Sequence, residues 1–122
     1  MMLAIVVGVA GALGAVARYL LDGAVQDRTE GFFPFGTLAV NVVGSLVLGV
    51  VAGLVLRHGA SSHLESVIGT GFCGGLTTWS TASWETVRLA EEDSVAAAAR
   101  YTGVNLVASL AAAALGLLVV WF

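Results

Sequence analysis

Four long apolar stretches restrict what this chain can fold into. They cover approximately residues 2–21, 35–56, 63–89 and 94–122. The hydrocarbon core of a bilayer is about 30 Å thick, so a helix needs about 20 apolar residues to cross it. Each stretch is therefore long enough to span a membrane. With 58% hydrophobic and 11% charged residues, the chain is too apolar for a soluble domain. We predict an all-α integral membrane protein, with residues 1–122 forming a single four-span subunit.

The few polar and charged residues argue against several other classes of function. The net charge of −3 gives no basic surface for nucleic acid. Cys73 is the only cysteine, which leaves no intrachain disulfide and no thiolate metal cluster. The two histidines, His58 and His63, lie in one short polar link, so no nucleophile–base pair and no enzyme activity are expected. No basic residue precedes the first apolar run, so we expect that run to be a retained span rather than a cleaved signal peptide.

The third apolar stretch contains residues that a lipid-facing helix avoids. Its middle reads Gly74-Gly75-Leu76-Thr77-Thr78 and is followed by further hydroxyls. Each glycine costs about 1 kcal/mol relative to alanine in a helix. A non-helical backbone in hydrocarbon must be buried in protein or face a watery cavity. We therefore predict that the third span breaks near residues 74–78, and a broken helix at mid-membrane depth is typical of an ion or solute site.

Two other spans carry polar stripes at helical spacing. The stripe in the second span consists of Thr37, Asn41, Ser45, Gly49 and Gly53. The stripe in the fourth span consists of Tyr101, Asn105 and Ser109. The Asn41 carboxamide must find partners in hydrocarbon. It is either an interhelical contact, worth roughly 0.6–2 kcal/mol, or a donor directed at a passing solute, and the spacing favours neither.

Small and charged residues near the span ends allow more ordinary interpretations. Gly8, Gly11 and Gly14 recur every three residues in the first span, which predicts close helix packing. Arg18 is either a snorkelling anchor or a charge at an anion entrance, and spacing alone favours the anchor. Glu85 lies three residues before Arg88, which predicts an intrahelical ion pair.

The polar groups of the spans favour a particular kind of solute. No acidic residue lies near the middle of a span, which argues against a proton relay or a cation pump. Amide N–H and hydroxyl groups donate hydrogen bonds, and an aromatic ring edge carries positive charge. Backbone carbonyls at a helix break suit a hard monovalent cation. The sequence therefore favours a small-anion path beside a fixed cation site.

Three sequence blocks resemble the Fluc (CrcB) fluoride channel family. They are Gly14-Ala15-Val16-Ala17-Arg18-Tyr19, then Gly36-Thr37-Leu38-Ala39-Val40-Asn41 with Gly44, and Gly71-Phe72-Cys73-Gly74-Gly75-Leu76-Thr77-Thr78 with Ser80-Thr81. The resemblance implies an antiparallel dimer of four-span subunits in the cell membrane, with two narrow pores and a central structural sodium ion. It also implies passive export of cytoplasmic fluoride, which relieves fluoride toxicity.

The resemblance implies specific site residues. The sodium ion is expected on the backbone carbonyls of Gly74 and Thr77 from both subunits. Together with the polar stripes, the resemblance gives an expected anion pathway of Arg18, Thr37, Asn41, Trp79, Ser80, Thr81, Glu85, Tyr101, Asn105 and Ser109.

Two features depart from the family pattern. The family has phenylalanine at two aromatic positions, where this chain has Trp79 and Ala82, so one ring edge is missing. Four of the five arginines flank the first and third loops, and Arg57 alone lies on the opposite side, which favours one fixed orientation. We therefore expect either a homodimer or, as our hypothesis, a heterodimer with an oppositely oriented homologue that supplies the missing aromatic. The alternatives are a small four-span multidrug-type exporter and a non-conducting membrane assembly subunit.

Overall fold

The computed structural model describes residues 1–122, and its regular elements are all helices. In chain order these are α1 (Met2–Gln26), α2 (Phe35–His58), α3 (Ser62–Leu64), η1 (Glu65–Cys73), α4 (Gly74–Leu76), α5 (Ser80–Glu92) and α6 (Val95–Val119). The helices α1, α2 and α6 are each long and apolar enough to cross a membrane. The predicted all-α membrane architecture is thus confirmed at this level.

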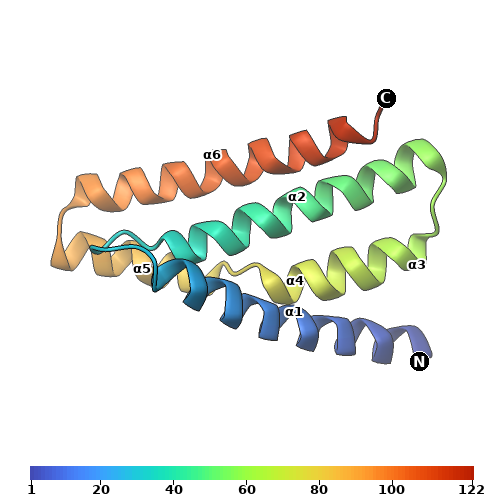
Figure 1. The fold of residues 1–122 in the computed structure, drawn as a ribbon, viewed down its shortest axis with the longest axis horizontal. Helices are drawn as coiled ribbons and strands as arrows, with labels where there is room; N and C mark the ends of the chain where they lie inside the picture. The colour runs from blue at the N-terminus through green and yellow to red at the C-terminus, as the bar shows by residue number, and fades with distance from the viewer.

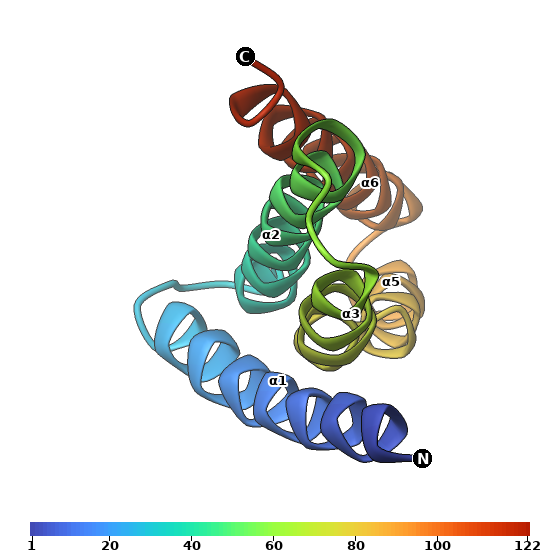
Figure 2. The same ribbon diagram turned by 90° about the vertical axis from the view of Figure 1, so that its right-hand side faces the viewer.

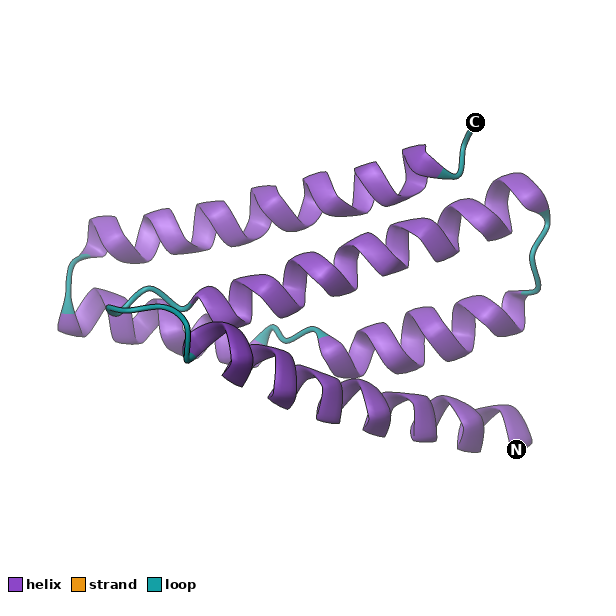
Figure 3. Cartoon of the chain, viewed as in Figure 1, coloured by secondary structure: helices purple, strands orange, loops and turns teal.

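The helices form an elongated bundle in which α2 occupies a central place. Helix α2 packs along α6 and also contacts α1 and η1, and both termini lie at the same end of the bundle (Figure 1). Viewed from that end, α1 crosses beneath the other helices, while α3 and α5 belong to one rod beside α2 (Figure 2). In this rod α3, η1 and α4 follow one another without interruption, residues 77–79 are not helical, and α5 continues beyond them (Figure 3).

The helix ends follow local sequence signals. Helix α1 continues five residues past the predicted end at residue 21, because no proline or capping glycine stops it there. Helix α2 ends where Gly59 takes the left-handed conformation, with φ of 66°, as glycine commonly does after a helix. The Ser94 side chain accepts a hydrogen bond from the Ala97 N–H and caps α6. Helices α2 and α6 run in the same direction, opposite to α1 and to the rod of α3–α5 (Figure 1).

Glycines let α1 approach the η1–α4 rod closely. A Cβ on Gly14 would overlap the carbonyl oxygen of Phe72, and a Cβ on Gly75 would overlap that of Gly11. The prediction of close packing is therefore confirmed for Gly11 and Gly14. It is wrong for Gly8, where a Cβ would meet nothing within 4 Å, because α1 contacts η1 at this level through Val7 and Ala10 and Gly8 is not part of that contact.

A glycine-to-alanine pair in α6 tests how much close helix packing contributes to stability. A Cβ at Gly116 would overlap the Leu46 carbonyl oxygen of α2, whereas at Gly103 it would meet nothing within 4 Å. We expect Gly116→Ala to lower the free energy of unfolding by about 1–3 kcal/mol, the usual cost of overpacking. Gly103→Ala should leave it unchanged or slightly raised. Thermal unfolding in detergent, followed by tryptophan fluorescence, measures both; equal midpoints for the two variants would contradict the packing.

Candidate functional site

The rod between α1 and α2 loses its helical conformation at Thr77, where the backbone is extended with φ of −80° and ψ of 162°. The predicted position of the break is shifted, because Gly74 and Gly75 remain helical in α4 and the non-helical residues are 77–79. Gly75 instead serves close packing, since it lies against α1, whereas a Cβ on Gly74 would meet nothing within 4 Å. The threonines and their hydrogen-bond partners therefore define the interruption.

Asn41 of α2 holds the interruption through its carboxamide. Its Oδ1 accepts a hydrogen bond from the Thr78 N–H at 2.8 Å, and its Nδ2 donates to the Thr78 carbonyl oxygen at 3.1 Å. The same Nδ2 donates to Oδ1 of Asn105 at 3.2 Å. Of the two roles that the sequence left open for Asn41, the geometry within the subunit is that of an interhelical contact.

Thr78 also organises the start of α5. Its Oγ1 accepts a hydrogen bond from the Thr81 N–H at 3.2 Å and donates to the Thr81 hydroxyl at 3.1 Å. The Ser80 hydroxyl lies 3.5 Å from the same oxygen. Sequence reasoning placed Thr78 in the break but did not assign it a role. Thr78 lies two residues before Ser80, where α5 begins, and a threonine close before a helix is a common signal of a capping side chain.

These side chains take two N–H groups that a continuous helix would use elsewhere. In an α-helix each N–H donates to the carbonyl four residues before it, which pairs Thr78 with Gly74 and Thr81 with Thr77. Here both N–H groups donate to side-chain oxygens instead. The carbonyls of Gly74 and Thr77 are consequently released from the helical pattern.

The surroundings of the two carbonyls differ. Arg18 of α1 donates from Nη1 to the Thr77 carbonyl oxygen at 3.2 Å, so its guanidinium contacts the interruption, a contact that neither the snorkelling anchor nor the charge at an anion entrance had included. Gly74 is exposed, and a Cβ there would meet nothing within 4 Å. No group of three or more His, Cys, Asp or Glu side chains that could hold a metal ion is found, and the oxygens around this place belong to the backbone and to hydroxyl and amide side chains.

The polar stripes of α2 and α6 converge on Glu85 of α5. Thr37 donates to Oε1 of Glu85 at 3.0 Å, and the Tyr101 hydroxyl donates to Oε2 at 2.8 Å. The predicted ion pair between Glu85 and Arg88 is wrong, because Arg88 instead lies 3.6 Å from Glu92. Two hydroxyl groups from neighbouring helices offer the carboxylate shorter partners than an arginine on its own helix.

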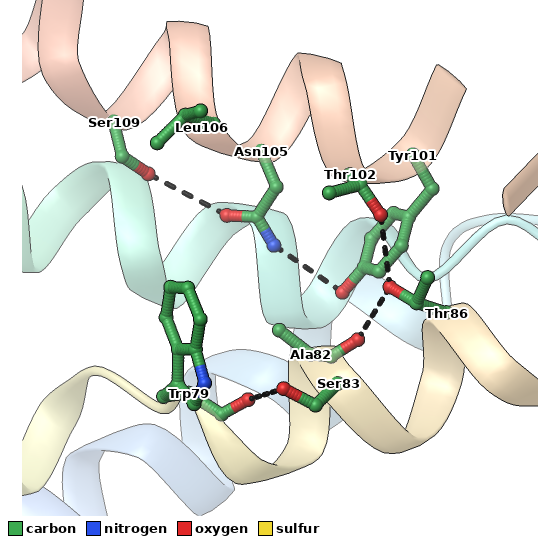
Figure 4. Close-up of a pocket in the computed structure, with 9 residues that line it drawn as sticks. All are labelled: Trp79, Ala82, Ser83, Thr86, Tyr101, Thr102, Asn105, Leu106 and Ser109. Carbon is green, nitrogen blue, oxygen red and sulfur yellow. Dashed lines mark hydrogen bonds between the residues drawn. The ribbon is translucent and has the colours of Figure 1, made fainter. Parts of the chain in front are cut away.

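The stripe on α6 forms a hydrogen-bonded row (Figure 4). Ser109 donates to Oδ1 of Asn105 at 3.5 Å, and Nδ2 of Asn105 donates to the Tyr101 hydroxyl at 3.3 Å. Tyr101 is fully buried, and its ring meets that of Phe33 edge-on at 5.5 Å. Since Asn41 also donates to Asn105, one network joins the interruption to Glu85. Phe33 has no sequence signal that separates it from an ordinary boundary aromatic.

Two cavities flank the interruption. One, of about 220 Å³, lies between α5 and α6 (Figure 4) and is lined by Trp79, Ala82 and the row Tyr101, Asn105 and Ser109. Its other polar lining residues, which the sequence did not single out, are Ser83, Thr86 and Thr102. The other cavity, of about 270 Å³, is lined by residues that include Asn41, Gly74, Thr77 and Thr78. Trp79 lines both cavities and is 84% exposed.

Most of the predicted site residues thus lie together. The network and the cavities include Thr37, Asn41, Trp79, Thr81, Glu85, Tyr101, Asn105 and Ser109, with Arg18 at the interruption. Ser80 is exposed at the start of α5 and lies at the edge of this group.

Comparison with known proteins gives consistent matches over nearly the whole chain. The model of the family described as CrcB-like protein, Camphor Resistance (CrcB), matches residues 5–117. A protein of Leifsonia xyli subsp. xyli named fluoride-specific ion channel FluC 1 is 52% identical over 112 residues, which cover 91% of this chain and 81% of that protein. A protein of the same name from Thermobifida fusca is 43% identical over 122 residues, covering 99% and 98% of the two chains. A third, from Streptomyces avermitilis, is 50% identical over 105 residues, covering 85% and 82%.

Proposed function

Since the chain belongs to the CrcB family and is a multi-pass protein of the cell membrane, we propose that it is a subunit of a passive, fluoride-selective ion channel. The name of its relatives points to fluoride. The single observation in the structure that supports the proposal best is the row of hydrogen-bond donors on α6 that runs beside an interrupted helix. Neither of the alternatives, a multidrug-type exporter or an assembly subunit, requires such a row of donors.

The proposed pathway follows the cavity between α5 and α6. Fluoride is small and tightly hydrated, so a pore must replace its water with donors along the path. Asn105 has one amide N–H beyond the one it donates to Tyr101, and the Ser109 hydroxyl could turn from Asn105 to the ion. Trp79 supplies an aromatic edge and an indole N–H. No covalent step is involved, so the protein acts as a channel and not as an enzyme.

The direction of net flow follows from the chemistry of the ion. Neutral hydrogen fluoride crosses membranes and dissociates in the more alkaline cytoplasm, where the anion is trapped. A selective pore lets the membrane potential drive fluoride outward, because moving one charge through 100 mV changes its free energy by about 2.3 kcal/mol. We therefore propose that the channel exports cytoplasmic fluoride and relieves its toxicity.

We further propose that α3, η1, α4 and α5 together make a third membrane span whose interruption holds a sodium ion. The residues fit such an ion, because the carbonyls of Gly74 and Thr77 are released from helical pairing. One subunit offers two oxygens, and an antiparallel partner subunit with the same motif would offer two more. Bound there, the ion would lower the electrostatic cost of an anion in the pathway.

Two features of the chain indicate a partner subunit that is not an identical copy. Ala82 lines the cavity beside Trp79 and gives it no second ring edge. Arginine distribution favours one orientation for this chain, whereas an antiparallel homodimer requires two. We propose that the chain pairs with an oppositely oriented homologue that carries the second aromatic residue.

Fluoride efflux from liposomes tests the function. The chain is reconstituted alone and together with a homologue from the same genome, and a fluoride electrode follows efflux after a potassium ionophore sets the potential. We expect robust fluoride efflux from the pair, at least about tenfold less from the chain alone, and no chloride efflux in parallel vesicles. Equal fluoride and chloride efflux, or none from any pair, would contradict the channel. Robust efflux from the chain alone, with a homodimer in detergent, would contradict only the heterodimer.

A further inference from the structure

We propose that Asn41 and Thr78 are positioning residues for the cation site, because they take the two N–H groups that would otherwise pair with the Gly74 and Thr77 carbonyls. The proposal rests on the proposed function for the identity of the cation. In this proposal the helix is opened by the side chains of Asn41 and Thr78 and not by Gly74 or Gly75.

The first N–H group belongs to Thr78. In a continuous helix it would donate to the Gly74 carbonyl, which lies four residues before it. It donates instead to Oδ1 of Asn41 at 2.8 Å, while Nδ2 of Asn41 donates to the Thr78 carbonyl at 3.1 Å. This pairing copies the two-point contact between adjacent strands and holds Thr78 out of the helix.

The second N–H group belongs to Thr81. Its helical acceptor would be the Thr77 carbonyl, and it donates instead to Oγ1 of Thr78 at 3.2 Å. The same hydroxyl donates to Oγ1 of Thr81 at 3.1 Å, so its lone pair stays directed at the backbone N–H. Thr78 therefore takes part in both altered hydrogen bonds: its main-chain N–H donates to Asn41, and its side-chain oxygen accepts from the Thr81 N–H.

The balance of donors and acceptors shows why this arrangement attracts a cation. Both diverted N–H groups have a partner, so neither pays the cost of an unpaired donor. The Gly74 and Thr77 carbonyl oxygens are left without these two N–H donors, and unwound backbone carbonyls are typical sodium ligands. Arg18 occupies one lone pair of the Thr77 oxygen, and a carbonyl has two, so that oxygen can hold both partners.

The test measures how sodium stabilises the purified dimer. Melting midpoints are recorded in sodium chloride and in N-methyl-D-glucamine chloride, which is too large for the site, and the sodium concentration giving half of the increase is determined. We expect Thr78→Val and Asn41→Leu each to raise this concentration at least tenfold. Thr78→Ser keeps the hydroxyl and should retain the original value. Thr29→Val is the matched control, because it removes a hydroxyl bond to the Gln26 carbonyl in the loop after α1.

The outcomes separate the inference from the proposed function. A purely structural role would lower the midpoints in both salts equally and leave the sodium-dependent increase intact, which would overturn the inference. The inference would also be overturned if Thr78→Val or Asn41→Leu folds and keeps the original half-saturating sodium concentration. If the unaltered dimer shows no sodium-dependent increase, the sodium proposal itself fails and the inference with it, whereas fluoride efflux from the same preparation would still support the channel.

Discussion

Replacing Ala82 with phenylalanine is expected to raise the fluoride efflux of this chain, reconstituted alone, by at least about tenfold. Ala82 stands where the family pattern has the second aromatic residue, and it lines the cavity between α5 and α6. That cavity measures about 220 Å³, and an apolar cavity of about 150 Å³ can hold a benzene ring. The cavity is therefore large enough in volume for a benzyl group, which would supply the missing ring edge.

The matched control is Ala90→Phe, which adds the same ring to an exposed position further along α5. It should leave efflux unchanged. Chloride efflux is measured in the same vesicles, since a gain in both ions would indicate a leak rather than a completed pathway. If Ala82→Phe adds no fluoride efflux although the pair with a homologue conducts, the missing aromatic is not what prevents the chain from working alone.

The sequence predicted the membrane class and the grouping of several polar side chains because these depend on local patterns. A run of about 20 apolar residues has few alternatives to a membrane helix. A stripe at i, i+4, i+8 stays on one face wherever the helix packs, so Tyr101, Asn105 and Ser109 could be grouped without a structure. Their joining into one row confirms the grouping.

What the sequence could not provide were contacts between helices. Two adjacent glycines are equally consistent with a break and with close packing, and only the position of α1 shows that Gly75 serves packing. The partner of Glu85 was misassigned for the same reason. Spacing along α5 favours Arg88, but Thr37 and Tyr101 come from α2 and α6, whose distance from α5 no local pattern encodes.

The contacts of Asn41 with Thr78 and Asn105 show why its role, as an interhelical contact or as a donor to a passing solute, could not be predicted from the sequence. A carboxamide has two donors and an acceptor, which can serve a passing anion or neighbouring helices equally well. Here they are engaged within the subunit. Donors for an anion must then come from groups with spare capacity, such as the indole of Trp79, which lines both cavities.

Tyr101→Phe is expected to lower fluoride efflux of the conducting dimer by about tenfold to a hundredfold while the fold persists. The ring, fully buried and edge-on to Phe33, is unchanged by the substitution. The lost hydroxyl donates to Glu85 and accepts from Asn105. A hydrogen bond to a charged group contributes about 1.5–3 kcal/mol, and an unpaired buried donor costs about 1–3 kcal/mol.

The effect on conduction follows from what these two partners do once the hydroxyl is gone. Glu85 keeps only Thr37 as a donor and is freer to turn its negative charge toward the cavity, where it repels an anion. Asn105 loses its acceptor, so the row of donors is interrupted one turn before the carboxylate. Both changes raise the barrier for fluoride, and 1.4 kcal/mol corresponds to each tenfold loss of rate.

Initial rates of fluoride efflux, measured at equal protein per vesicle, check this prediction. Tyr19→Phe is the control, because the Tyr19 side chain is 79% exposed at the surface of α1 and lies outside the network. Melting midpoints of the two variants should agree within a few degrees, which separates loss of conduction from loss of fold. Unchanged efflux in Tyr101→Phe would mean that fluoride does not depend on the Tyr101–Asn105–Ser109 row, and the proposed pathway along α6 would have to be abandoned.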